Sequence, residues 1–385
     1  MLVGPVNRQH PLSHSHKVRL SLHLLRHCAA KRFSFPLWSS IHKALFSFPP
    51  HTARLASTST PSPSFTLPKM KNIILFDFDG TITAHDTINV LASLAAARNP
   101  HTTPLWEDIV TRYVADHADH LKSYKPEAKD RTTLAQELKF LESLGSVEQK
   151  SVDRVGGSGL FAALKGEDFK AFGRQAVVQE KPEGGNIQKT KGAAIHDDEP
   201  RVEAEDEERV ELRNGFREFV DVAQKKGWEL GIVSINWSRE FIEGVLGIKD
   251  LVAGDRIKAN GIRWPGGKVE GYEDGNGKKV LMTVEDKLRA MRDLVNEIRS
   301  DWTDDERGGK VAYFGDSTTD MACLVEADLG VVISDENHES KLLKVLKRVG
   351  LDVPHVKECN GGEGLVWAKD FDQFLSSKAI ETLEG

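Results

Sequence analysis

Short apolar runs alternate with longer segments of helical periodicity along most of this chain. Four of the runs read as buried strands: 72–77 (NIILFD), 228–234 (WELGIVS), 310–316 (KVAYFGD) and 329–333 (LGVVI). Nearly continuous apolar character is typical of parallel strands that are covered on both faces. Strands that alternate with helices indicate βα units, so the pattern predicts an α/β fold with a mostly parallel sheet.

The region between the first two strands has a helical pattern. Apolar residues recur at three- and four-residue spacing, which predicts helices within 86–97, 105–124, 133–144 and 168–178. Gly156, Gly157 and Gly159 are expected to interrupt this pattern. Further helices are predicted over 210–227, 237–247, 284–298 and 319–327.

A group of turn signals lies between the second and third predicted strands. Residues 255–283 contain Asn260-Gly261, Pro265-Gly266-Gly267, Asp274-Gly275 and Asn276-Gly277, separated by short strand-like pieces. This arrangement predicts a small β-hairpin inserted into the α/β core.

Two segments lack the pattern of a folded core. Residues 1–69 are rich in Arg, Ser, His and Pro and contain no acid, which fits an organelle transit peptide, a disordered leader, or an extension upstream of a true start at Met70. Residues 179–208 end in a strongly acidic run, which favours a solvated loop over an acidic tail that binds a partner.

Composition narrows the class of protein. Beyond the basic leader the chain carries 43 basic against 58 acidic residues, which argues against a nucleic-acid partner. The chain has no apolar run of the length of a membrane span, so no membrane association is expected. The three cysteines are far apart and favour a reducing compartment. We expect a cytoplasmic protein, or a mitochondrial one if the leader is a transit peptide.

Polar side chains follow the predicted strands at the ends that meet in a parallel sheet. Asp77 and Asp79 follow the first strand, Ser234 and Asn236 follow the second, and Asp316 and Asp320 follow the third. Lys287, near the start of a predicted helix, is a further candidate. In an open parallel sheet the carboxyl ends of the strands form the ligand-binding crevice, so these groups are expected to converge. Lys278, Lys279 and Lys310 compete with Lys287 for the role of the lysine.

Such a site suits Mg²⁺ and a phosphoryl group. Carboxylates that lie close together need a cation to stay ionised, and an oxygen-rich site with few protein ligands suits Mg²⁺. Backbone N–H groups near Gly80 and Thr81 can bind phosphate oxygens. One carboxylate can then attack phosphorus to form an aspartyl phosphate, while the second moves a proton.

These residues resemble the haloacid dehalogenase superfamily of phosphotransferases. Its first motif, DxDGT, appears at 77–81, and its second, a Ser or Thr after an apolar strand, at Ser234. Its lysine matches Lys287, and its GDxxxD motif appears at 315–320. The order and the intervals match over residues 72 to about 335.

The resemblance implies a role for each matching position. Asp77 would be the nucleophile, and Asp79 would protonate the leaving group and then activate water. Mg²⁺ would be bound by the Asp77 carboxylate, the Asp79 backbone carbonyl and Asp316, while Asp320 would orient Lys287 or support the metal shell. Lys287 and Ser234 would stabilise the phosphoryl oxygens.

The likeness is greatest to phosphoserine-phosphatase-like enzymes, which include uncharacterised fungal members. It implies a helical cap inserted after the first strand. Asp86 would bind a substrate amine or cap the helix that follows, and Asn236 would line the substrate site. Ser317 and Thr319 stand where Gly and Asn are usual in the fourth motif, which puts phosphoserine as the substrate in doubt.

The combined prediction is a Mg²⁺-dependent phosphomonoesterase that acts on a small phosphorylated metabolite. A Rossmann-like core would comprise 70–84 and 226–385, with the helical cap at 85–225. The alternatives are a phosphomutase, or a catalytically idle scaffold whose acidic loop binds a partner. The sequence does not specify the oligomeric state.

Overall fold

The computed structural model describes most of the chain after the leader. The described residues are 71–177, 209–247, 254–274, 277–303, 306, 308–335, 340–362 and 364–383. They belong to the unit Lys69–Gly385. The predictions for 1–69 and for 179–208 concern residues outside these ranges.

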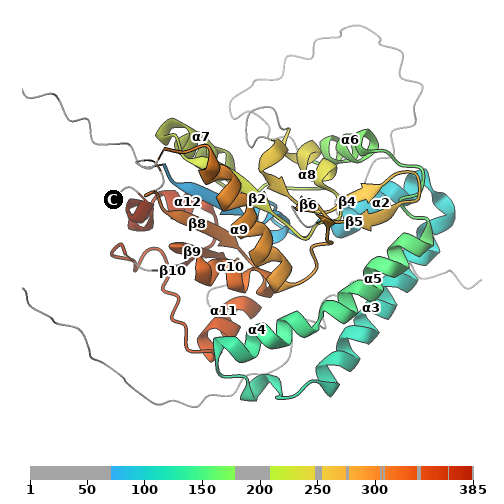
Figure 1. The fold of residues 1–385 in the computed structure, drawn as a ribbon, viewed down its shortest axis with the longest axis horizontal. Coiled ribbons are helices and arrows are strands. Elements are labelled where there is room, and N and C mark those ends of the chain that lie inside the picture. The colour runs from blue at the N-terminus through green and yellow to red at the C-terminus, as the bar shows by residue number, and fades with distance from the viewer. Residues whose placement is uncertain are drawn as a thin grey trace, which may run out of the picture. The chain divides into compact units, whose positions relative to one another are not determined.

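A six-stranded, all-parallel sheet forms the centre of the described chain (Figure 1). Its order is β10-β9-β8-β1-β2-β3. The strands are β1 (Ile73–Phe76), β2 (Glu229–Val233), β3 (Ile257–Lys258), β8 (Val311–Gly315), β9 (Leu329–Ile333) and β10 (Leu365–Ala368). The four strands predicted from apolar runs are β1, β2, β8 and β9, so the predicted α/β class and parallel sheet are confirmed.

The register of β1 aligns the ends of its neighbours. Phe76 lies opposite Ile232 of β2 and opposite Phe314 of β8. The next residue of each strand therefore emerges at the same edge of the sheet. This register places the polar residues that follow the three strands side by side.

Alternate residues of the strands pack into two hydrophobic layers, one on each face. On one face Phe76 makes edge-on contacts with Phe216 and Phe219 of α7 and with Phe371 of α12, at ring separations of 5.6, 5.8 and 5.9 Å. The helices of the sheet region are α7 (Phe216–Lys226), α8 (Arg239–Leu246), α9 (Val284–Ser300), α10 (Met321–Glu326), α11 (Lys341–Arg348) and α12 (Phe371–Leu375). Side chains of α9, α10 and α11 share the other layer with Ile73.

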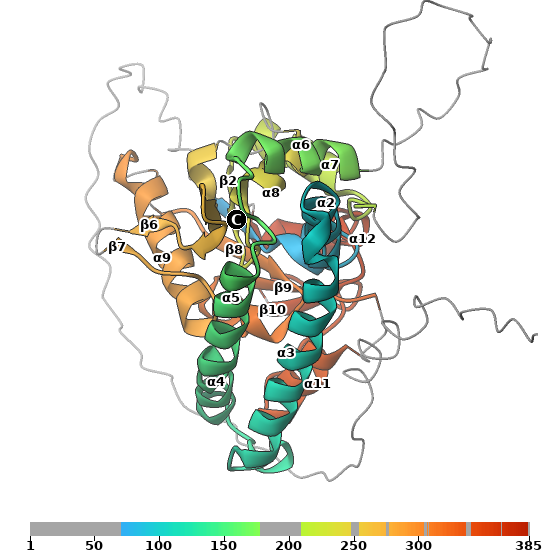
Figure 2. The same cartoon turned by 90° about the vertical axis from the view of Figure 1, so that its right-hand side faces the viewer.

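The chain between β1 and β2 is mainly helical, in the position predicted for the cap. Its helices are α2 (Ile88–Arg98), α3 (Thr103–Ser123), α4 (Leu134–Ser143), α5 (Gly145–Ser158) and α6 (Gly166–Ala176). Figures 1 and 2 show α3 and α5 lying side by side. The range predicted for the cap, 85–225, also takes in most of α7, but this helix packs against the sheet.

Two of the contacts between the cap and the sheet region are specific enough to describe. At one of them α6 crosses α8 at a close approach, because Gly173 faces the backbone of Phe241 and Gly244 faces the backbone of Lys170. At the other, the buried Glu137 carboxylate accepts from Arg131 at 2.8 Å and from Arg348 of α11 at 2.5 Å. The second contact joins the base of the cap to the core.

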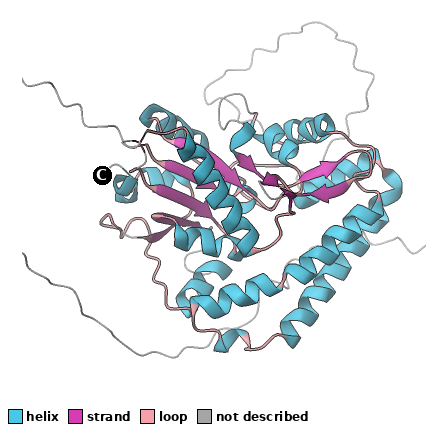
Figure 3. Cartoon of the chain, viewed as in Figure 1, coloured by secondary structure: helices cyan, strands magenta, loops and turns pink. Residues whose placement is uncertain are grey.

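Three local predictions differ from the structure. The helix predicted over 210–227 begins only at Phe216, because Gly215 has a φ of 75°, which ends the extended segment before it. Helix α5 continues through Gly156 and Gly157 and ends at Gly159, in the left-handed conformation. The predicted hairpin is two antiparallel pairs, formed by β4 (Gly261–Arg263) with β5 (Lys268–Glu270) and by β6 (Glu273–Asp274) with β7 (Gly277–Lys278), which lie apart from the central sheet (Figure 3).

Candidate active site

The loop after β1 is shaped to bring its first carboxylate back over its own backbone. Asp77 is buried, and its Oδ1 accepts a hydrogen bond from the N–H of Phe78 at 2.7 Å. Gly80 follows in the left-handed region, with a φ of 74°. A Cβ at Gly80 would lie 2.4 Å from Oδ2 of Asp316, so only glycine fits here. The backbone of the loop at Gly80 therefore lies directly against the carboxylate that follows β8.

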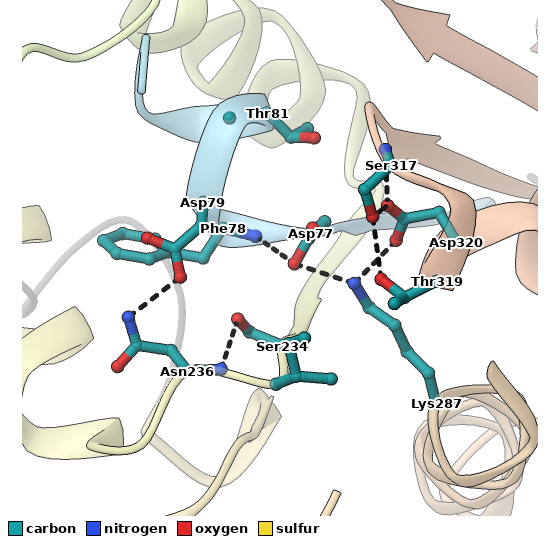
Figure 4. Close-up of polar contacts among 12 residues, drawn as sticks. Asp77, Phe78, Asp79, Thr81, Ser234, Asn236, Lys287, Ser317, Thr319 and Asp320 are labelled. Carbon is teal, nitrogen blue, oxygen red and sulfur yellow. Dashed lines mark hydrogen bonds and ion pairs between the residues drawn. The ribbon is translucent and has the colours of Figure 1, made fainter. Parts of the chain in front are cut away.

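A fully buried lysine joins the two ends of the site (Figure 4). The Nζ of Lys287 lies 2.9 Å from Oδ1 of Asp77 and 2.7 Å from Oδ1 of Asp320. Thr283 caps the start of α9, with its side chain accepting from the N–H of Asp286, and so directs Lys287 inward one turn later. Burial alone would lower the pKa of Lys287, but Asp320 and Asp77 outweigh it and raise that pKa.

The competing lysines are engaged elsewhere. Lys278 pairs with Glu270 at 3.0 Å, Lys279 pairs with Asp286 at 2.6 Å, and Lys310 donates to a backbone carbonyl near the C-terminal end. Only Lys287, of these four, contacts the carboxylates that follow β1 and β8.

Asp320 is held by three hydrogen bonds and one ion pair. Its Oδ1 accepts from the Tyr313 hydroxyl at 2.8 Å and is paired with Lys287 at 2.7 Å, and its Oδ2 accepts from the N–H and the hydroxyl of Ser317 at 3.1 and 2.8 Å. An ionised carboxylate offers about four acceptor positions. These contacts fill them, so the Asp320 side chain is built to fix Lys287.

Three carboxylates gather at this edge of the sheet. One oxygen from each of Asp77, Asp316 and Asp320 lies within 4.8 Å of the others. Burial and the neighbouring Asp320 raise the pKa of Asp77 well above its usual range, and the same causes raise that of Asp316 to about 7. One lysine does not balance three acids, and hard oxygen donors in this number suit Mg²⁺. The residues therefore fit a divalent cation.

The second acid of the loop is held in a different environment from the first. Oδ1 of Asp79 accepts from the N–H and the hydroxyl of Thr87 at 2.9 and 2.6 Å, and Oδ2 accepts from Nδ2 of Asn236 at 2.9 Å. Burial raises the pKa of Asp79, and the bonds from Thr87 and Asn236 limit the rise. The Asp79 carboxylate is not part of the group formed by Asp77, Asp316 and Asp320.

The residues after β2 complete this side of the site. Ser234 is fully buried, and its hydroxyl accepts from the N–H of Asn236 at 3.1 Å while pointing toward Asp77 (Figure 4). Asn236, expected among the substrate-binding residues, holds Asp79 in this structure. Thr81 donates to Oδ1 of Asp316 at 3.2 Å, which ties the loop to β8.

Asp86 lies at the start of the cap. Its Oδ1 accepts from the N–H of Ile88, the first residue of α2, at 2.8 Å, while the N-cap position of that helix is Thr87. Although the side chain is exposed, surrounding protein and the charge of Asp79 raise the pKa of Asp86 to about 7. Binding of a substrate amine by Asp86 remains a prediction.

Sequence reasoning missed three residues that support the site. Thr87 holds Asp79, Tyr313 holds Asp320, and Arg213 binds the loop after β1. Tyr313 looks like one more apolar residue of a strand, and Arg213 lies inside a segment with a helical pattern. Only Thr87, beside a predicted helix start, carried a usable signal.

The fold and the site together define the class: an α/β protein with an acidic site at the carboxyl edge of its parallel sheet. The acids follow β1 and β8, and a buried lysine lies between them. The model of the haloacid dehalogenase-like hydrolase family matches residues 71–328. The chain belongs to this family.

Several named proteins are similar to this chain. Cold tolerance protein 1 of Saccharomyces cerevisiae is 24% identical over 316 residues, covering 77% of this chain and 90% of that protein. The CTO1 family protein C17G9.12c of Schizosaccharomyces pombe is 23% identical, covering 72% and 88%. The mitochondrial bifunctional TH2 protein of Arabidopsis thaliana is 21% identical, covering 74% of this chain and 43% of that protein. Two of these relatives are fungal, as the resemblance predicted.

Solved structures of phosphoserine phosphatases also align with the chain. A substrate-bound phosphoserine phosphatase is 16% identical with a TM-score of 0.39, covering 80% of this chain and 98% of that one. A phosphoserine phosphohydrolase-like protein from Francisella tularensis is 17% identical with a TM-score of 0.40, covering 80% and 99%. Among the described residues, no helix combines the length and the apolar character needed to cross a membrane.

Proposed function

We propose that this protein is a Mg²⁺-dependent phosphomonoesterase that hydrolyses a small phosphorylated metabolite through an aspartyl phosphate on Asp77. The observation that carries the proposal is the division of labour between the two acids of the loop. Asp77 is paired with the buried Lys287, whereas Asp79 is held separately by Thr87 and Asn236. Two acids in different environments are suited to different roles, one as nucleophile and one as proton carrier.

The first step would be attack by Asp77 on phosphorus. Both Phe78 and Lys287 bind Oδ1, so we assign the attack to Oδ2. A bond from Oδ2 to phosphorus forms while the bond from phosphorus to the ester oxygen breaks. Asp79, whose raised pKa favours the protonated form, gives its proton to the departing alkoxide. Lys287 and Ser234 would stabilise negative charge on the phosphoryl oxygens.

The second step would return Asp77 to its starting state. Asp79, now ionised, takes a proton from water as that water attacks phosphorus, and the bond between phosphorus and Asp77 breaks to release inorganic phosphate. The tight hold of Thr87 and Asn236 on Asp79 keeps this carboxylate in one place for both proton transfers. The same residue therefore acts first as acid and then as base.

Asp77 and Asp316 would hold the Mg²⁺. Burial, and after it the charge of Asp320, raises the pKa of both carboxyls, so a bound cation would favour their ionised forms. When bound, Mg²⁺ would neutralise part of the charge of the carboxylates and the phosphoryl oxygens. Asp320, with its acceptor positions filled by Tyr313, Ser317 and Lys287, would act through Lys287 instead.

Phosphate release from a panel of phosphorylated metabolites, with and without Mg²⁺, tests the proposal. Wild type should release phosphate from at least one compound, EDTA should abolish the release, and Asp77→Asn should be inactive. Asp221→Asn, an exposed acid on α7, is the matched control and should behave as wild type. Conversion of a sugar phosphate to its isomer without phosphate release, or full turnover by Asp77→Asn, would contradict the proposal.

A further inference from the structure

One buried arginine binds the backbone of the loop that carries both acids. Arg213 is 8% exposed and lies where the chain returns from the cap to the sheet region. Its Nη2 donates to the carbonyls of Gly80 at 2.7 Å and Ala84 at 3.3 Å, and its Nε donates to the carbonyl of Thr81 at 3.1 Å. Three of the five N–H donors of a guanidinium are thus spent on this loop.

The remaining donors of Arg213 reach two other loops at the same edge of the sheet. Nη1 donates to the Asp335 carboxylate, after β9, at 2.5 Å, and to the carbonyl of Lys369, after β10, at 3.2 Å. All five guanidinium donors therefore have acceptors, and three loops share one cation. A lysine has three donors on a single nitrogen and cannot reproduce this planar arrangement.

The backbone of Arg213 also belongs to the crossing between cap and core. Its N–H donates to the carbonyl of Ile82 at 2.8 Å, and the N–H of Ala84 donates to the carbonyl of Glu211 at 2.8 Å. Thr83 and Leu212 form an antiparallel bridge between these bonds. The outgoing and returning chains are therefore paired next to the acids.

We infer that Arg213 is a positioning residue for phosphoryl transfer, which fixes the Gly80–Thr81 backbone so that the loop can bind phosphoryl oxygens. A trans peptide directs its N–H away from its carbonyl. Holding the Gly80 and Thr81 carbonyls against Arg213 therefore orients the N–H groups of Thr81 and Ile82 away from it. This inference rests on the proposed function, since the loop matters to catalysis only if a phosphoryl group binds there.

The test compares Arg213→Lys with Arg217→Lys, an exposed arginine one turn along on α7. The first readout is kcat and KM for p-nitrophenyl phosphate with Mg²⁺. We expect Arg213→Lys to lower kcat by about ten- to a hundredfold, because small misplacements of reacting groups cost that much, with KM changed far less. Arg217→Lys should match wild type in both parameters.

The second readout does not need activity. Amide hydrogen exchange in the peptide covering 77–84 should be faster in Arg213→Lys than in wild type, while exchange in β9 and α9 stays the same. Unchanged exchange in this peptide, or unchanged kcat in an active enzyme, would overturn the inference. If wild type hydrolyses no phosphate ester, the proposed function fails, and unchanged loop exchange would still refute the positioning role separately.

Asp335→Ala keeps the inference testable if Arg213→Lys does not fold. The Asp335 side chain is 53% exposed, so its loss should leave the fold intact while removing the anionic partner of Arg213. We expect the same pattern in weaker form: faster exchange in 77–84 and a fall in kcat of a few fold at constant KM. Wild-type exchange in 77–84 together with wild-type kcat would count against the positioning role of Arg213.

Discussion

Replacing Lys287 with methionine probes the electrostatic balance on which the site depends. Lys287 and Asp320 are fully buried, and Asp77 is nearly so, with 5% of its side chain exposed. Methionine keeps most of the volume of lysine but removes the charge. The change therefore leaves two buried carboxylates without their cation, while the packing of α9 against the sheet is largely preserved.

The size of the effect follows from the two contact distances. Opposite unit charges about 3 Å apart attract by about 5–6 kcal/mol at an effective dielectric constant of about 20. The cost of burying the ions offsets much of this attraction, and removing one partner of a buried pair costs about 3–5 kcal/mol in practice. We expect Lys287→Met to lower the free energy of unfolding by this amount near neutral pH in the absence of metal.

Urea unfolding monitored by circular dichroism measures this change, with Lys278→Met as the control. Lys278 pairs with Glu270 at 3.0 Å, but its side chain is 48% exposed, so its loss should cost less than about 1 kcal/mol. The double variant Lys287→Met/Asp320→Asn should recover part of the stability, because it removes one orphaned charge. The deficit of Lys287→Met should also shrink in acid, where the carboxylates become protonated.

Equal stability losses in Lys287→Met and Lys278→Met, with no dependence on pH, would refute this reasoning. Such a result would mean that Lys287 and the carboxylates around it contribute no more than a surface ion pair. In phosphatase assays we expect Lys287→Met to lower kcat by about a hundred- to a thousandfold, as for the loss of one group that stabilises charge in the transition state.

Three further predictions address glycines and pH. Gly80→Ala should abolish catalysis in kcat measurements, because its Cβ would lie 2.4 Å from Oδ2 of Asp316; retained turnover would show that the loop can move away. Gly244→Ala should lower stability by about 1–3 kcal/mol in thermal melts, because its Cβ would lie 2.2 Å from the Lys170 carbonyl, whereas Gly157→Ala meets no atom within 4 Å and should be neutral or stabilising. The pKa of Asp316 is raised from 3.8 to about 7 in the folded protein, so the folded state holds this proton more tightly than the unfolded state does. The resulting stabilisation is fully present below pH 3.8 and is lost as the pH rises through about 7. Metal-free melting temperature should therefore fall over this range, Mg²⁺ should restore it at the upper end, and a rising metal-free curve would contradict the assignment.

The sheet and the polar residues along its carboxyl edge were predictable because their signals are local. The apolar runs of β1, β2, β8 and β9 identify buried strands, and parallel pairing then brings Asp77, Ser234 and Asp316 to one edge. These conclusions needed only the periodicity of the chain and the rule that strand ends share an edge. The choice of Lys287 among the competing lysines came instead from the resemblance to the haloacid dehalogenase superfamily, whose lysine lies on the helix between the second and fourth motifs.

The supporting contacts were not predictable, because they join residues far apart in the chain. Arg213 reaches Gly80 over 133 positions, and Asn236 reaches Asp79 over 157. No local pattern separates Arg213 from an exposed helical arginine. The short strand β3 has no apolar run that could have predicted it. Its two residues, Ile257 and Lys258, form a strand by pairing with β2.

The chemistry of the proposed intermediate gives the most direct test of the account. Wild type and Asp77→Asn would be mixed with p-nitrophenyl phosphate and Mg²⁺, quenched in acid, digested and analysed by mass spectrometry. The account predicts the added mass of one phosphoryl group on the wild-type peptide that contains Asp77, removable by hydroxylamine, and no such adduct in Asp77→Asn. Phosphate release by an active wild type with no adduct on this peptide, or with the adduct on another residue, would contradict it.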